Sequence, residues 1–229
     1  NRNLRTRPLL KKIFWPPNWF RSWASADELR KEYIRHLFAG EDPTLAEQPG
    51  RPEFIFCATD MVFGVNWESS HEKVGSYEAG YMKPPPPEWT LARAVAASSC
   101  FPPVFPPARA LADPERMKGG QNKHSDRKDK VSGIRLTDGG VYDNLGLQPV
   151  EREEIVFSSD GGGILKFERV TLPWSLLVRY ASLLQSGIGK LRKRRLMQDF
   201  METPPRKRGT YLDIGQGSQQ ESPPFPHQE

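Results

Sequence analysis

The stretch Leu136-Thr137-Asp138-Gly139-Gly140-Val141-Tyr142-Asp143-Asn144 decides how the rest of the chain is interpreted. Within residues 131–136, Ile134 and Leu136 are apolar with Arg135 between them, and this alternation predicts a short strand that ends at about Asp138. Two glycines follow, and they allow either a positive φ or the close approach of another backbone segment. A carboxylate in this position is well placed to act as a base. Asp-Gly is also a common pair in hairpin turns, so this stretch alone favours an ordinary turn.

The surrounding sequence points to an active site instead. Upstream lies LARAVAASSCFPPVF at residues 91–105, and downstream lie YDNLGLQP at 142–149 and VFSSDGG at 156–162. Together with Asp138-Gly139-Gly140 and in this order, these stretches resemble the C-terminal half of a patatin-like phospholipase domain. The resemblance runs from about Glu53 to about Ile214. It implies an α/β fold, a three-layer α/β/α sandwich with a mainly parallel sheet, of which only the C-terminal part is present.

The resemblance also implies a chemistry. Patatin-like enzymes hydrolyse acyl esters of lipids with a Ser-Asp dyad, and Asp138 matches the aspartate of that dyad, within the motif Asp138, Gly139 and Gly140. Asp138 is therefore expected to be the general base. Asp143 and Asp160 are expected to be structural, Asp143 because a short acidic side chain can cap the following turn. The dyad requires no metal and no cofactor, and the four histidines are scattered without ligand spacing.

The nucleophile of such a dyad is missing from the sequence. A nucleophilic serine normally lies on a sharp turn written G-x-S-x-G, and no serine of this chain has glycine on both sides at that spacing. Ser98 and Ser99 fall at the end of a predicted helix, and Ser159 has only Gly161. The glycine run at 161–163 is expected to be a structural turn and no oxyanion loop. The chain is therefore expected to be the C-terminal portion of a domain and to be inactive alone.

The formal net charge of +5 is concentrated near the ends of the chain. Residues 1–23 hold six Lys or Arg and no acid, and residues 188–209 hold eight with two acids. Such runs either form solvated faces or contact anionic lipid. No nucleic-acid-binding module accompanies them, so a nucleic-acid partner is not expected. The alternative function is a non-catalytic module that binds anionic lipid surfaces or a partner protein.

Three segments follow from composition. Residues 1–23 form a basic and aromatic lead segment, 24–214 the patatin-like portion, and 215–229 a polar, proline-rich tail expected to be disordered. No signal peptide and no apolar run of about 20 residues is visible, which predicts a cytoplasmic protein with possible peripheral membrane contact. Cys57 and Cys100 lie in apolar contexts and are expected to be free thiols.

The spacing of apolar residues along the chain predicts its helices and strands. Helices are predicted from Ser25, with Glu28 completing a capping box, to a stop at Gly40, and over 91–99 and 174–201. Thr90 is the expected cap of the second helix. Strands are predicted over 54–58, 61–67, 154–157 and 209–214, and the polar stretch 117–132 is predicted to be a loop.

Overall fold

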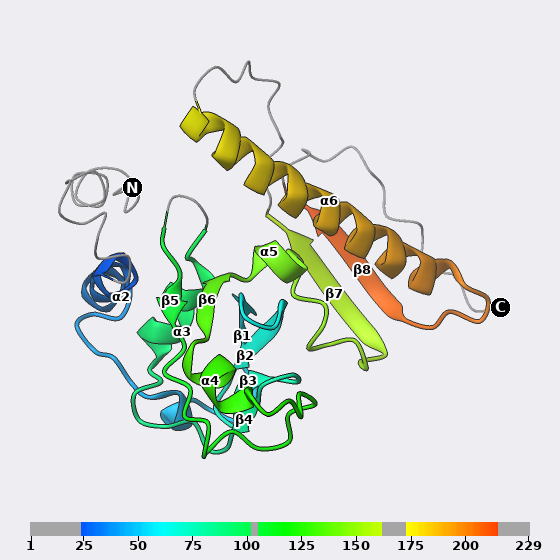
Figure 1. The fold of residues 1–229 in the computed structure, drawn as a ribbon. Coiled ribbons are helices and arrows are strands. Elements are labelled where there is room, and N and C mark those ends of the chain that lie inside the picture. The colour runs from blue at the N-terminus through cyan, green and yellow to red at the C-terminus, as the bar shows by residue number, and fades with distance from the viewer. Residues whose placement is uncertain (1–23, 102–104, 162–172, 215–229) are drawn as a thin grey trace. The chain divides into compact units, whose positions relative to one another are not determined.

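A computed structural model describes residues 24–101, 105–161 and 173–214 (Figure 1). The predicted lead segment at 1–23 and the tail at 215–229 lie outside these residues. Helices and strands are mixed, as an α/β chain requires. The chain forms two compact units, of which the first ends at Tyr142 and the second begins at Asp143. Within the described ranges, no helix is both long and apolar enough to cross a membrane.

A six-stranded sheet is the centre of the first unit. Its spatial order is β4-β3-β2-β1-β6-β5, and every neighbouring pair is antiparallel (Figure 1). The strands are β1 (Phe56–Asp60), β2 (Val65–Ser69), β3 (Val74–Ser76), β4 (Gly80–Met82), β5 (Ala108–Arg109) and β6 (Arg135–Asp138).

The expectation of a mainly parallel sheet is wrong for this unit. Parallel neighbours need a crossover of a dozen or more residues, whereas the links between β1, β2, β3 and β4 are short turns. The link from β1 to β2 is stabilised by Asp60, whose Oδ1 accepts hydrogen bonds from the backbone N–H groups of Val62 at 2.8 Å and Phe63 at 3.2 Å. This turn directs the chain straight back along β1.

The helical elements between residues 24 and 143 are α2 (Ala24–His36), the 3-10 turn η2 (Leu45–Glu47), α3 (Leu91–Ser98), α4 (Arg127–Ser132) and α5 (Gly140–Asp143). Of these, α3 packs on the sheet and α2 packs on α3. The prediction of α3 is confirmed, including its cap, since the Thr90 hydroxyl accepts a hydrogen bond from the Arg93 N–H at 3.3 Å. Four buried alanines of α3 allow it to lie close to β1 and β6.

Two tryptophans lie at the middle of the apolar core. The rings of Trp67 and Trp89 are both fully buried and stack with centroids 5.8 Å apart. Leu45, Met82 and Leu136 belong to the same cluster. Because buried aromatic pairs contribute both area and ring contact, this pair ties β2 to the segment that leads into α3.

Several predicted boundaries differ from the structure. Strand β1 begins at Phe56, and the expected second strand at 61–67 instead begins with a turn at 61–64 and continues as β2. The expected loop at 117–132 ends in helix α4, which carries Val131 into the core. Helix α2 begins at Ala24, one residue before the predicted start.

The second unit contains a strand, a helix and a parallel strand. Strand β7 (Ile155–Asp160) pairs in parallel with β8 (Arg208–Asp213), and α6 (Pro173–Met201) connects them (Figure 1). Among the described residues this is the only parallel pair. Lys193 of α6 lies over the Tyr211 ring at 4.2 Å and 3.6 Å from the Asp213 carboxylate, so α6 covers the sheet face that carries these residues. The predicted helix at 174–201 and strand at 209–214 are confirmed, each to within one residue.

Two glycines of this unit, Gly209 and Gly187, have opposite environments. Substitution by alanine is therefore expected to change the free energy of unfolding in opposite directions. Gly209 has φ +141°, and a Cβ there would lie 1.8 Å from the Val156 carbonyl oxygen, so Gly209→Ala is expected to lower the free energy of unfolding by ~2 kcal/mol or more. Gly187 in α6 faces open space, and Gly187→Ala is expected to raise the free energy of unfolding by ~1 kcal/mol. Thermal melting of both variants checks this, and an unchanged melt of Gly209→Ala would contradict the β7–β8 register.

Candidate functional site

Asp138 is the last residue of β6, and helix α5 begins two residues later at Gly140. The strand partners of β6 are β1 and β5, which both precede it in the chain. The interpretation of Asp138-Gly139 as a hairpin turn is therefore wrong. The motif occupies a strand-to-helix junction, which is the kind of position where a side chain can be presented at the end of a sheet.

Segments distant in sequence fix the backbone of this junction. The N–H of Asp138 donates to the Cys100 carbonyl at 3.0 Å, and the N–H of Gly139 donates to the Ser98 carbonyl at 3.3 Å. From the other side, the Thr59 hydroxyl donates to the Asp138 carbonyl at 2.8 Å. The end of α3 and the middle of β1 therefore hold the Asp138 backbone between them.

Gly139 is required for close approach. A Cβ at this position would lie 2.5 Å from the carbonyl oxygen of Cys57, a distance that real Cβ atoms do not adopt. Neither Gly139 nor Gly140 is among the described glycines with positive φ. Of the two roles that the sequence allowed for these glycines, the structure therefore selects backbone proximity at Gly139.

The Asp138 carboxylate has two different oxygens. Oδ1 accepts a hydrogen bond from the Gly140 N–H at 2.8 Å, and Oδ2 has no hydrogen bond to any residue in the described part of the chain. Burial raises the pKa of the Asp138 carboxyl above its usual value, and the Gly140 hydrogen bond opposes part of this rise. A carboxylate with a raised pKa and an unused oxygen is suited to accepting a proton.

Cys100 is the titratable neighbour of Asp138. Burial, together with the charge of Asp138, raises the pKa of the Cys100 thiol to about 12. Its Sγ lies 3.1 Å from the Ala96 carbonyl, to which the thiol donates. Cys100 is therefore a neutral thiol and a poor nucleophile. Cys57 and Cys100 are both free, as the sequence predicts.

The three serines weighed as nucleophiles lie in ordinary secondary structure. Ser98 ends α3 and uses its carbonyl to hold Gly139, and the Ser99 hydroxyl donates to the Val95 carbonyl at 2.7 Å. Ser159 is an exposed residue of strand β7. Within the described residues, no serine hydroxyl forms a hydrogen bond with the Asp138 carboxylate.

Asp143 and Asp160 both make contacts that support local structure. Asp143 is buried, and its Oδ2 accepts the Gln148 N–H at 2.7 Å, which is the turn-capping role expected from the sequence. Its Oδ1 lies 3.9 Å from Arg192 Nε of α6. Asp160 ends β7 and accepts the Tyr211 hydroxyl at 2.7 Å, so it joins the two parallel strands.

Asp60 is a further buried carboxylate that the sequence analysis did not single out. It is fully buried, and burial raises its pKa. Because its Oδ1 already accepts the two N–H groups of the β1–β2 turn, its contacts are those of a turn residue. An aspartate four residues before Gly64 is the signal that predicts such a turn.

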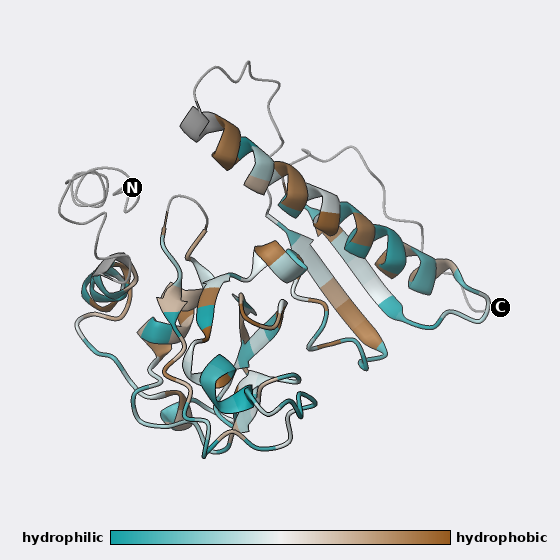
Figure 2. Cartoon of the chain, in the orientation of Figure 1, coloured by the Kyte–Doolittle hydropathy of each residue, from teal (hydrophilic) through white to brown (hydrophobic). Residues whose placement is uncertain are grey.

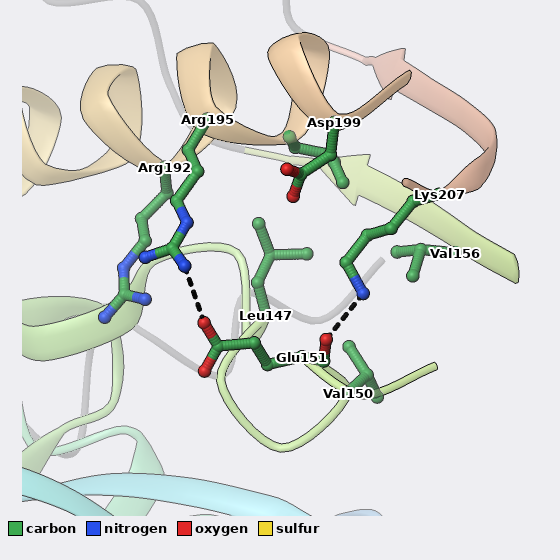
Figure 3. Close-up of a pocket in the computed structure, with 9 residues that line it drawn as sticks. Leu147, Val150, Glu151, Val156, Arg192, Arg195, Asp199 and Lys207 are labelled. Atoms are coloured by element: carbon green, nitrogen blue, oxygen red, sulfur yellow. Dashed lines mark hydrogen bonds and ion pairs between the residues drawn. The ribbon is translucent and has the colours of Figure 1, made fainter. Parts of the chain in front are cut away.

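A small cavity lies within the second unit, between α6 and the segment that precedes β7 (Figure 3). Arg195 forms an ion pair with the Glu151 carboxylate at 2.9 Å, and Lys207 donates to the Glu151 carbonyl at 2.6 Å. The cavity volume is about 30 Å³, close to the space of one water molecule. Sites for small ligands measure roughly 300–1,000 Å³, so this cavity is too small for a lipid ester.

Neither a metal site nor a related protein indicates a second candidate for the functional site in the described part of the chain. Within the described ranges, no three His, Cys, Asp or Glu side chains are grouped so that they could hold a metal ion. Comparison with protein-family models and with curated protein sequences found no match. The Asp138 junction is therefore the candidate site on its own geometry.

Asp138→Asn is expected to stabilise the first unit at neutral pH. Since the pKa of Asp138 is higher in the folded than in the unfolded state, wild-type stability decreases as pH rises through the range between the two pKa values. Asparagine can still accept the Gly140 hydrogen bond but carries no charge to bury. The gain is expected to be ~1 kcal/mol or less at pH 7, because a pKa unit corresponds to about 1.4 kcal/mol and solvent screens a half-buried group.

The measurement is thermal melting as a function of pH. The gain should diminish as pH falls through the folded and then the unfolded pKa of Asp138, and it should be lost at about pH 3 and below, where the carboxyl is mostly protonated in both states. Asp129→Asn, at an exposed position of α4, is the matched control and should show no such gain. A gain for Asp138→Asn that persists unchanged at acidic pH would show that buried charge is not its cause.

Proposed function

We propose that this chain supplies the general-base half of a serine acyl hydrolase that acts on lipid esters. The observation that carries the proposal is the Asp138 junction. Its carboxylate combines a raised pKa, one oxygen held by Gly140 and one oxygen without a hydrogen bond in the described chain. The resemblance of residues 53–214 to patatin-like phospholipases adds the reaction class and the expected partner residue.

In the proposed reaction, Asp138 acts alternately as a base and as an acid. A serine hydroxyl is positioned at Asp138 Oδ2, which takes the proton as the serine oxygen attacks the ester carbonyl carbon. Collapse of the tetrahedral intermediate forms an acyl-serine, and protonated Asp138 gives the proton to the departing alcohol. Asp138 then removes a proton from water as the water oxygen attacks the acyl-serine. Collapse of this second tetrahedral intermediate releases the fatty acid, and protonated Asp138 returns the proton to the departing serine oxygen. The serine and the oxyanion-binding N–H groups come from a segment outside the 229 residues, on a G-x-S-x-G turn.

We further propose that β7, α6 and β8 belong to a three-layer sandwich. α6 covers one face of the parallel pair, and the other face carries Ile155, Phe157, Leu212 and Ile214, which are 54–72% exposed. Parallel sheets are normally covered on both faces, so a second layer is expected over these residues. A nucleophile-bearing segment is a natural source of that layer.

The test uses a longer chain that includes the proposed G-x-S-x-G segment and compares three substitutions. Asp138→Asn should lower kcat on a lipid ester by on the order of 10²–10⁴, the effect expected for loss of a general base. Asp143→Asn and Asp160→Asn remove carboxylates with structural contacts and should change mainly the melting temperature. The 229-residue chain alone should show only background hydrolysis of a nitrophenyl ester.

Two results would contradict the proposal. One is near-wild-type kcat for Asp138→Asn together with a loss of activity in Asp143→Asn or Asp160→Asn. The other is turnover by the 229-residue chain that a serine-directed fluorophosphonate abolishes. That second result would make Ser98, Ser99 and Ser159 the candidates for the nucleophile.

A further inference from the structure

The N-terminal turns of α6 are largely apolar (Figure 2), and the exposed residues of the helix form its outer side. Its exposed residues recur at the helical spacing of three and four, and six of them are large and apolar, with exposed fractions from 40% to 70%. They are Leu176, Leu177, Tyr180, Leu183, Leu184 and Leu191. Single exposed leucines are common, but a continuous stripe of this kind indicates an interaction surface.

The same side of α6 becomes cationic toward its C-terminal end. Residues 173–198 contain six Lys or Arg and no Asp or Glu. Lys190 and Arg194 are both exposed and lie within the stripe, and they line an open depression together with Lys193, Met197 and Gln198. One face of a single helix therefore presents apolar side chains followed by positive charge.

The opposite side of α6 is already used for packing. Leu196 is buried, and Gly189 allows the Asn144 side chain to approach within 3.3 Å of the position a Cβ would occupy. Gln185 donates a hydrogen bond to Asn144 Oδ1 at 3.1 Å. Packing within the second unit therefore accounts for the inner side of the helix and leaves the exposed stripe without a role in the fold.

We infer that the outer side of α6 is a docking surface for an anionic lipid membrane. A second copy of the chain would fit this surface poorly. An antiparallel pairing of two α6 stripes would place the cations of each against the leucines of the other, and a parallel pairing would place cations against cations. A lipid interface instead offers an acyl region for the leucines and phosphates for Lys190 and Arg194.

The N-terminal turns of α6 insert into the lipid, and the C-terminal turns remain at the level of the headgroups. This docking surface would bring the enzyme to its lipid, so the inference extends the proposed function. It rests on the proposed function only for the identity of the substrate. Binding itself requires no hydrolysis. An Asp138→Asn variant should therefore bind membranes as the wild type does, which separates failure of this inference from failure of the proposed function.

The experiment is flotation of the full chain with phosphatidylcholine vesicles, prepared with and without phosphatidylserine, at low and high salt. The wild type should float with the anionic vesicles at low salt. Lys190→Gln with Arg194→Gln should weaken this binding about 25-fold, since each basic residue near such a surface is worth ~1 kcal/mol, or about fivefold. Leu177→Gln with Leu184→Gln should abolish it.

Arg35→Gln with Lys128→Gln is the matched control, because it removes two exposed cations outside α6 and should bind as the wild type does. Circular dichroism melting of each variant establishes that the fold is retained. Equal binding to neutral vesicles, unchanged binding of either α6 double variant, or equal weakening by the control would overturn the inference. Light scattering that shows a dimer, which Leu177→Gln with Leu184→Gln converts to a monomer, would assign the stripe to a second copy instead.

Discussion

The contact between Gly139 and the carbonyl of Cys57 is the constraint on which the candidate site depends. It lets the turn after β6 lie against β1, and at that distance no side chain fits at position 139. The same closeness brings the Asp138 carbonyl within reach of the Thr59 hydroxyl and the two N–H groups of the turn within reach of α3. Removal of water from around Asp138 follows from this packing, and it is the largest cause of the raised pKa of that carboxyl.

Asp60 and Asp138 lie on neighbouring strands of one sheet, but their carboxylates have different hydrogen-bond partners. Asp138 lies opposite Ala58, whereas Asp60 lies opposite Leu136, so the two side chains belong to different positions along β1. Burial raises the pKa of both. Asp60 accepts two backbone N–H groups of a tight turn on one oxygen, and Asp138 accepts one. The difference lies in how the chain leaves each strand: a four-residue turn after Asp60 and a helix after Asp138.

Local patterns predicted the elements whose cause is local. Helix α3 follows from its alanines and the Thr90 cap, and α6 follows from apolar spacing over eight turns. The direction of the strands did not follow, because pairing depends on partners far along the chain: Thr59 and Asp138, which hydrogen-bond each other, are 79 residues apart. The apolar residues Met61 and Val62 suggested a strand, yet they occupy an exposed turn, since the N–H groups satisfied by Asp60 outweigh a preference for extended backbone.

The sequence identifies the Asp-Gly-Gly motif, but it does not show why glycine is needed at position 139. Asp-Gly-Gly predicts a turn on composition alone, and both a positive φ and a close approach satisfy that prediction. Only the position of Cys57, 82 residues earlier in the chain, distinguishes the two. Gly189 of α6 is a second glycine whose role depends on a contact that the sequence does not show. From sequence it is a weak position that costs ~1 kcal/mol relative to alanine, but in the structure its missing side chain makes room for Asn144, five residues after Gly139. Gly187, two residues earlier in the same helix, has no neighbour within 4 Å of the position a Cβ would occupy. The sequence presents the two glycines alike, and only the position of a residue distant in sequence shows which of them makes room for a contact.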